Sequence, residues 1–122
     1  MIAFELLKDK GVLVIEPNGA LAADDFRAVA RAVDPFIAEK GNLTGVLIKA
    51  PSFPGWDSFG ALLEHLKFVR EHHREIDRVA AVTDSAVMQI GPAIARHFAH
   101  PEIRVFGSTE GDRAMAWLET GT

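Results

Sequence analysis

The sequence predicts a single-domain α/β protein over residues 1–122, with a mixed, mostly parallel sheet of about five strands and with four helices. Three observations carry this prediction. The chain has the length of one domain. The run Gly45–Ile48 is too apolar for a strand with one wet face, which indicates a central strand covered on both sides. Strand-like runs alternate with helical patterns after an initial hairpin, the arrangement typical of parallel sheets with packed helices.

The amino-terminal part predicts the hairpin and a first helix. Ile2–Leu7 and Val12–Ile15 are short apolar runs around the polar turn Lys8–Gly11, which favours an antiparallel pair. The predicted first helix has the carboxylates Asp24 and Asp25 in its first turn, where the helix dipole favours them. Gly41-Asn42 is expected to end this helix. Its helical apolar positions are Phe26, Val29, Ala30, Val33, Phe36 and Ile37. Asp34-Pro35 lies inside this pattern and is expected to kink or restart the helix.

The middle of the chain predicts a loop and a second helix after the central strand. Pro51–Trp56 ends the strand, because each proline lacks an amide donor and disfavours helix before it. From Asp57 onward, side chains that are apolar apart from Arg70 recur at helical steps and gather on one face. The positions of this pattern are Phe59, Leu62, Leu63, Leu66, Val69 and Arg70.

The last third predicts two more strands and two more helices. Val79–Thr83 and Pro101–Phe106 are strand-like, and Asp84-Ser85 is a candidate cap for a helix between them. The apolar positions of that helix are Val87, Ile90, Ile94 and Phe98, although Gly91-Pro92 weakens its first half. Thr109 and Asp112 resemble a capping box before a final helix with Met115, Trp117 and Leu118.

Composition and charge exclude several classes of protein. Apolar residues make up 48% and charged residues 25%, as in an ordinary globular domain. A net charge of -4 argues against nucleic acid as a partner, because phosphate binding needs a basic face. The absence of cysteine removes disulfides and thiolate sites. With neither a signal-peptide pattern nor an apolar run of about 20 residues, the expected location is the cytoplasm, with membrane-surface contact left open.

The loop after the central strand is the candidate site, because open α/β sheets place ligands where strand ends meet helix N-termini. Phe53 and Trp56 are large rings in a stiff loop that can form a pocket wall or a contact patch, whereas the favoured interpretation is that they cover the end of the core. Asp57 and Ser58 are candidate caps of the second helix. A phosphorylated Ser58 would place about two negative charges at a helix N-terminus, where they are tolerated.

Motifs for metal, nucleotide or hydrolytic chemistry are weak. His65 and His72 share a helix face, with His73 beside them, yet the spacing is not HExxH and no third ligand follows, so we expect solvated histidines and no metal. Ser58 lacks the G-x-S-x-G elbow of a hydrolase, and no glycine-rich phosphate motif is present. The sequence therefore predicts neither a cofactor nor an enzyme, with an uncharacterised hydrolase as the remote alternative.

The order of elements resembles the STAS fold of the anti-sigma factor antagonist SpoIIAA. The chain resembles more closely the small bacterial SpoIIAA-like proteins, also described as STAS/SEC14 domain-containing. The residues that carry this resemblance are Phe53-Pro-Gly-Trp56, Leu66-Lys67-Phe68, Arg78-Val-Ala-Ala-Val82, Val105-Phe106 and Ala114-Met-Ala-Trp117-Leu118. The resemblance covers nearly the whole chain and implies the STAS-like fold.

The resemblance also implies a site. Antagonists of this fold carry a phosphorylated serine in an Asp-Ser-Ser/Thr-Gly motif, and Ser58 falls on it in Asp57-Ser58-Phe59-Gly60. Phe59 departs from the motif, since it replaces the small hydroxyl residue. The SEC14 resemblance implies a lipid-like ligand by analogy of fold.

Two main hypotheses follow for function. The first is a non-enzymatic regulatory or protein-interaction module with a regulatory protein partner. The second is a small binding protein for an apolar or anionic ligand. That ligand would lie between the second helix and its neighbour, with Trp56 and Phe59 as the wall of the site. The residues of this ligand or partner site are Phe53, Pro54, Trp56, Asp57, Ser58, Phe59 and Leu62. A homodimer through Phe98, Phe106 and Trp117 is a further expectation, unless these rings complete the core.

Overall fold

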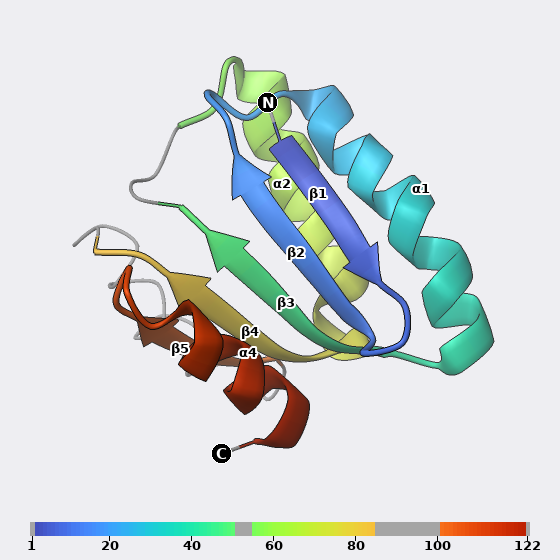
Figure 1. The fold of residues 1–122 in the computed structure, drawn as a ribbon. Coiled ribbons are helices and arrows are strands. Elements are labelled where there is room, and N and C mark those ends of the chain that lie inside the picture. The colour runs from blue at the N-terminus through green and yellow to red at the C-terminus, as the bar shows by residue number, and fades with distance from the viewer. Residues whose placement is uncertain (1, 51–54, 85–100, 122) are drawn as a thin grey trace.

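The computed structural model describes residues 2–50, 55–84 and 101–121 of the chain. Five strands form one sheet in the order β1-β2-β3-β4-β5 (Figure 1). Strands β1 and β2 pair antiparallel, and the other neighbours pair parallel, which confirms the mixed, mostly parallel sheet. The strands are β1 (Ile2–Leu7), β2 (Val12–Pro17), β3 (Leu43–Lys49), β4 (Ile76–Val82) and β5 (Glu102–Phe106).

Three α-helices lie within the described residues, against the four expected. They are α1 (Ala23–Lys40), α2 (Phe59–His72) and α4 (Gly111–Thr120), and the short 3-10 helix η1 (His73–Glu75) follows α2. The helix expected after Asp84-Ser85, with Phe98 near its end, falls on residues 85–100 and lies outside the described part of the chain.

The helices cover opposite faces of the sheet, with α1 and α2 on one and α4 on the other (Figure 1). Alternation along each strand supplies both cores. Leu13 and Val46 pack in the cluster that α1 completes, whereas Val12 and Leu47 pack in the cluster with α4. Strand β3 is therefore covered on both sides, as its apolar run predicts.

Helix α1 passes through Pro35 as one continuous helix, so the expected restart does not occur. At its start, the Asp25 carboxylate accepts a hydrogen bond from the Ala22 amide at 2.8 Å, which binds an otherwise unpaired donor. At its end, Gly41 has a φ of 95° and its amide donates to the Ile37 carbonyl. A residue with φ in this range is most easily glycine, and the predicted stop is confirmed.

The predicted capping box of the last helix is wrong. Helix α4 begins at Gly111, with Glu110 at the cap position. The Glu110 carboxylate turns back and accepts a hydrogen bond from the Gly107 amide at 3.0 Å, and the Glu110 amide donates to the Gly107 carbonyl. This turn places Thr109 one residue before the cap, so the predicted helix start is displaced.

Candidate functional site

The loop that leads into α2 is fastened to the segment before α1. Leu21 and Trp56 form an isolated parallel bridge. The Leu21 amide donates to the Gly55 carbonyl at 2.8 Å, and the Asp57 amide donates to the Leu21 carbonyl at the same distance. Gly55 has a φ of 78°, which favours glycine. Two backbone bonds therefore fix Trp56 beside the carboxyl edge of the sheet.

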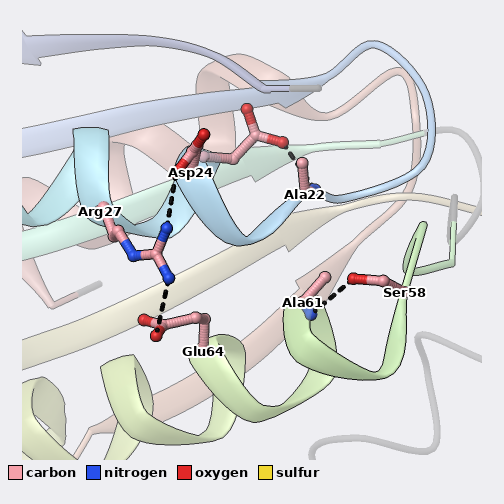
Figure 2. A network of polar contacts seen from close by, with 7 residues as sticks. Ala22, Asp24, Arg27, Ser58, Ala61 and Glu64 are labelled. Atoms are coloured by element: carbon pink, nitrogen blue, oxygen red, sulfur yellow. Dashed lines mark hydrogen bonds and ion pairs between the residues drawn. The ribbon is translucent and has the colours of Figure 1, made fainter.

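Ser58 is the N-cap of α2, as predicted. Its backbone is extended, and its hydroxyl accepts a hydrogen bond from the Ala61 amide at 3.0 Å (Figure 2). Asp57 is exposed, and the capping bond belongs to Ser58 and not to Asp57. Among the described residues, the Ser58 hydroxyl makes this capping bond and no hydrogen bond to a histidine, while His97 and His100 lie outside them.

Trp56 and His65 form a hydrogen-bonded aromatic pair. The Trp56 Nε1–H donates to His65 Nδ1 at 3.1 Å, which assigns the ring proton of neutral His65 to Nε2. The His65 ring stacks on Phe26 with centroids 4.7 Å apart and planes 17° apart, so α1 and α2 share this contact. Burial lowers the pKa of His65, because desolvation disfavours the imidazolium.

The outward side of α2 carries large apolar side chains in water. Phe59 is 73% exposed, Leu63 51% and Leu66 58%. We call these three residues the outer α2 stripe; they recur at steps of four and three, so they share one side of the helix. Trp56 is 38% exposed and precedes them in the chain. An amphipathic helix usually packs its apolar side on the core, whereas α2 buries Ala61 and His72 and leaves this stripe free.

His72 links α2 to α1. The ring is 6% exposed and lies flat against Phe68, with centroids 4.1 Å apart. Its Nε2 lies 2.7 Å from Asp34 Oδ1, and its Nδ1 lies 2.7 Å from the Phe68 carbonyl oxygen. The expectation of solvated histidines is wrong for His65 and His72, because both are packed between the helices.

A salt-bridge network spans α1 and α2 closer to their N-termini. Figure 2 shows the Arg27 guanidinium between two carboxylates: it donates to Asp24 at 2.6 Å and to Glu64 at 3.3 Å. These contacts raise the pKa of Arg27, first through the Asp24 hydrogen bond. The Arg27–Glu64 ion pair is a polar contact between α1 and α2 at the surface.

A groove of about 290 Å³ lies between α1 and α2. Its aromatic lining is Phe26, Phe68 and His72, and its rim includes both cations and carboxylates. Trp56 and Phe59 are not among its lining residues, so the expected ligand wall is not the wall of this groove. Sequence reasoning missed it because its residues come from two helices with no shared motif.

A second polar cluster lies where β4 and β5 end. The Asp84 carboxylate accepts hydrogen bonds from the Ser108 hydroxyl at 2.5 Å and the Ser108 amide at 3.1 Å. Both bonds lower the pKa of Asp84, the hydroxyl bond most. Asp84 thus ties the loop after β5 to the end of β4.

The remaining expected site residues divide into two groups. Phe53 and Pro54 lie outside the described residues, whereas Leu62 is half-buried on α2.

Phe106 and Trp117, two of the rings expected at a dimer interface, are 5% and 3% exposed and belong to the core beneath α4. They therefore complete the core and form no surface patch; the third ring, Phe98, is not described. Within the described ranges, no three His, Cys, Asp or Glu side chains gather as a metal site.

An edge hairpin followed by parallel strands, with helices on both faces of the sheet, makes this a small α/β domain. The family model described as SpoIIAA-like matches residues 12–119, and the chain belongs to the SpoIIAA-like family. The fold is similar to that of an uncharacterised protein with a SpoIIAA-like fold from Shewanella loihica, with a TM-score of 0.69 and 23% identity over 97% of this chain and 92% of the other. No curated protein sequence matches the chain. None of the described helices is long and apolar enough to cross a membrane.

Proposed function

We propose that this protein is a non-enzymatic protein-interaction module whose docking surface is Trp56 and the outer α2 stripe. The observation that carries the proposal is the exposure of Phe59, Leu63 and Leu66 on one side of a helix. Every large apolar side chain that is exposed in the described parts of the chain lies on α2 or just before it. Apolar side chains gathered in this way are typical of protein contacts, whereas scattered ones need no explanation.

The surface is rigid enough to serve as a docking site. The Ser58 cap holds the first turn of α2, and the Trp56–His65 hydrogen bond holds the indole against the helix. The Arg27–Glu64 ion pair adds a contact from α1. A partner would therefore meet side chains on an ordered helix, which reduces the entropy lost on binding.

Site-specific crosslinking in the native host tests the proposal. A photoreactive benzoylphenylalanine replaces Leu63 in one variant and Ala116, an exposed residue of α4, in the control. A single adduct is expected at position 63 and not at 116. Its protein partner, identified by mass spectrometry and purified, should bind the wild-type chain and lose at least about tenfold in affinity on Leu63→Ser, as for a central apolar contact. Equal crosslinking at both positions, or unchanged binding by Leu63→Ser, would overturn the proposal.

Phosphorylation of Ser58 is the regulation we propose for this surface. Ser58 is exposed at a helix N-terminus directly before Phe59, and a phosphate there would add negative charge where the dipole tolerates it. Intact mass spectrometry of the protein from its host should show a gain of about 80 Da that Ser58→Ala removes. A host protein with no such form would end the phosphorylation proposal and leave the docking surface in place.

The groove between α1 and α2 supports a second candidate function, the binding of a small anionic ligand with an apolar body. Its volume of about 290 Å³ is at the small end of ligand sites. Phe26 and Phe68 supply apolar walls, and Arg31 and Lys67 make no ion pair with the described residues. Native mass spectrometry of the host protein should then show a non-covalent mass that denaturation releases and that Arg31→Glu abolishes; an apo mass would reject this candidate.

A further inference from the structure

The side of α2 that carries the outer α2 stripe becomes basic toward the end of the helix. Four residues follow one another on this side at steps of four, three and four: Phe59, Leu63, Leu66 and Arg70. Arg74, in η1, comes four residues later. Arg70 and Arg74 are exposed and make no ion pair with any described residue. The surface is therefore an apolar strip of three side chains that continues into positive charge, and Val69, 48% exposed, directly precedes Arg70 in the chain.

The carboxylates of α2 lie on another side of the helix, and the next carboxylate in the chain is Glu75 of η1, which follows Arg74. Glu64 and Glu71 line the groove toward α1, a different side of the helix, and Glu64 is already paired with Arg27. Lys67 lines the same groove. Arg70 is thus presented along the line of the apolar side chains, available to a negative group on whatever binds them.

We propose that the partner presents an amphipathic, acidic segment that lies along α2, with apolar side chains on Phe59, Leu63 and Leu66 and Asp or Glu side chains at Arg70 and Arg74. This inference rests on the proposed docking function and names the chemistry of its partner. The distance from Phe59 to Arg70 along the helix is about 16 Å at the rise of an α-helix. A partner helix of about three turns spans it, and such helices bind grooves and helix faces through apolar residues at steps of three and four.

A protein segment fits this surface better than a membrane does. The chain carries a net charge of -4, so an anionic bilayer repels the molecule as a whole, although it would attract Arg70. Interfacial helices bury a broad apolar face with lysines and arginines at its edges. In this protein one side of α2 is already packed on the sheet and α1, so only the opposite, outer side is available to a membrane. Charge complementarity over a short strip is the usual property of a peptide contact.

Selection from a displayed library of helix-forming peptides tests the partner chemistry directly. The library, about 18 residues long with free positions on one side, is selected on the full wild-type chain and counter-selected on Leu63→Ser. We expect enriched peptides with apolar residues at helical spacing and Asp or Glu at one end. Their affinity should fall about fivefold on Arg70→Glu, in the range of an exposed ion pair replaced by repulsion, and weaken with salt. Arg113→Glu, the same charge change on the exposed side of α4 and on the opposite face of the sheet, should leave it within about twofold.

Each other result separates this inference from the docking function. Enriched peptides that are neutral or basic, or that ignore Arg70→Glu, would overturn the acidic partner and leave the docking surface standing. Failure to enrich any peptide that Leu63→Ser rejects would count against both. Sedimentation with vesicles of phosphatidylcholine and phosphatidylserine, lost in Leu63→Ser, would assign the surface to a membrane. A dimer in sedimentation velocity that Leu63→Ser dissociates would assign it to a second copy of this chain.

Discussion

Ser58 has a structural role that any signalling role would have to preserve. Its hydroxyl binds the Ala61 amide, one of the unpaired donors at the start of α2. We expect Ser58→Ala to lower the free energy of unfolding by about 1 kcal/mol, measured by urea denaturation. Ser58→Asp should keep the stability, because Asp caps as well as Ser. An Asp variant as unstable as the Ala variant would mean that the cap is not what Ser58 contributes.

His65 gives the fold a pH dependence whose sign follows from its environment. Burial lowers its pKa from 6.5 in the folded state, while the unfolded chain titrates near the ordinary value. Below that pH the unfolded state binds more protons, so the contribution of His65 to stability is fully present above pH 6.5 and is lost as the pH falls below it. Protonation also removes the acceptor for Trp56 Nε1–H.

The measurement is chemical denaturation between about pH 5 and 8, with His65→Gln as the comparison. The fall in unfolding free energy of the wild type below pH 6.5 should be smaller in the variant. Tryptophan fluorescence of the native protein should change over the same range, and Trp56→Phe should remove that change. Identical pH profiles for wild type and His65→Gln would contradict the assignment.

The histidines also show where sequence reasoning stops at the scale of single residues. The spacing of His65 and His72 correctly places both on one side of α2, because helical periodicity fixes angular positions. It does not say what that side faces. The structure brings Phe26 and Asp34 of α1 against them, and these partners are 39 and 38 positions away in the chain. A contact between two helices depends on their packing, which leaves no local pattern in either sequence.

Helix α2 gives the same lesson at the scale of an element. Its apolar positions form an amphipathic pattern, yet the residues that the helix buries are Ala61 and His72, whereas Phe59, Leu63 and Leu66 are exposed. The extent of α2 was therefore predictable from periodicity and its cap, whereas the direction of its apolar side was not.

Two substitutions in α2 distinguish the exposed side of the helix from its buried side. Leu63→Ser should change the free energy of unfolding by about 0.5 kcal/mol or less, because the side chain is half in water. Ala61→Leu should destabilise by about 1–3 kcal/mol, since Ala61 is fully buried and added methylenes have no space. Urea denaturation measures both. The reverse ranking would show that the stripe packs on the core and is not a docking surface.

Gly45 is where strand β3 meets helix α4. A Cβ built there would lie 2.7 Å from Leu118 Cδ2 and 3.1 Å from Leu118 Cβ, and Leu118 is fully buried. Gly45→Ala should therefore cost about 1–3 kcal/mol of unfolding free energy. A double variant with Leu118→Ala should show coupling, because the smaller side chain relieves the clash. Strict additivity of the two single changes would argue against this contact.

At the scale of the whole molecule, the two faces of the sheet have different roles. The face under α4 is closed by Phe106 and Trp117, whose centroids lie 5.9 Å apart, with the Arg104 guanidinium over both rings. The other face carries α1 and α2 and, with them, every candidate site residue that the structure describes. The sequence predicts the two-sided burial of β3, since a continuous apolar run has no wet side. It does not predict which rings close a core and which stay outside.

Trp117 tests this division of faces. Trp117→Phe should lower the free energy of unfolding by about 1–3 kcal/mol, because it removes volume from a core where Trp117 is 3% exposed. It should leave the sedimentation coefficient of the native protein unchanged, since a buried ring does not contact a second chain. Leu63→Ser should have the opposite effects: the free energy of unfolding should be kept, and binding to the partner should be lost. A change of oligomeric state in Trp117→Phe would indicate that the aromatic rings form an interface and that the docking surface lies on the α4 face.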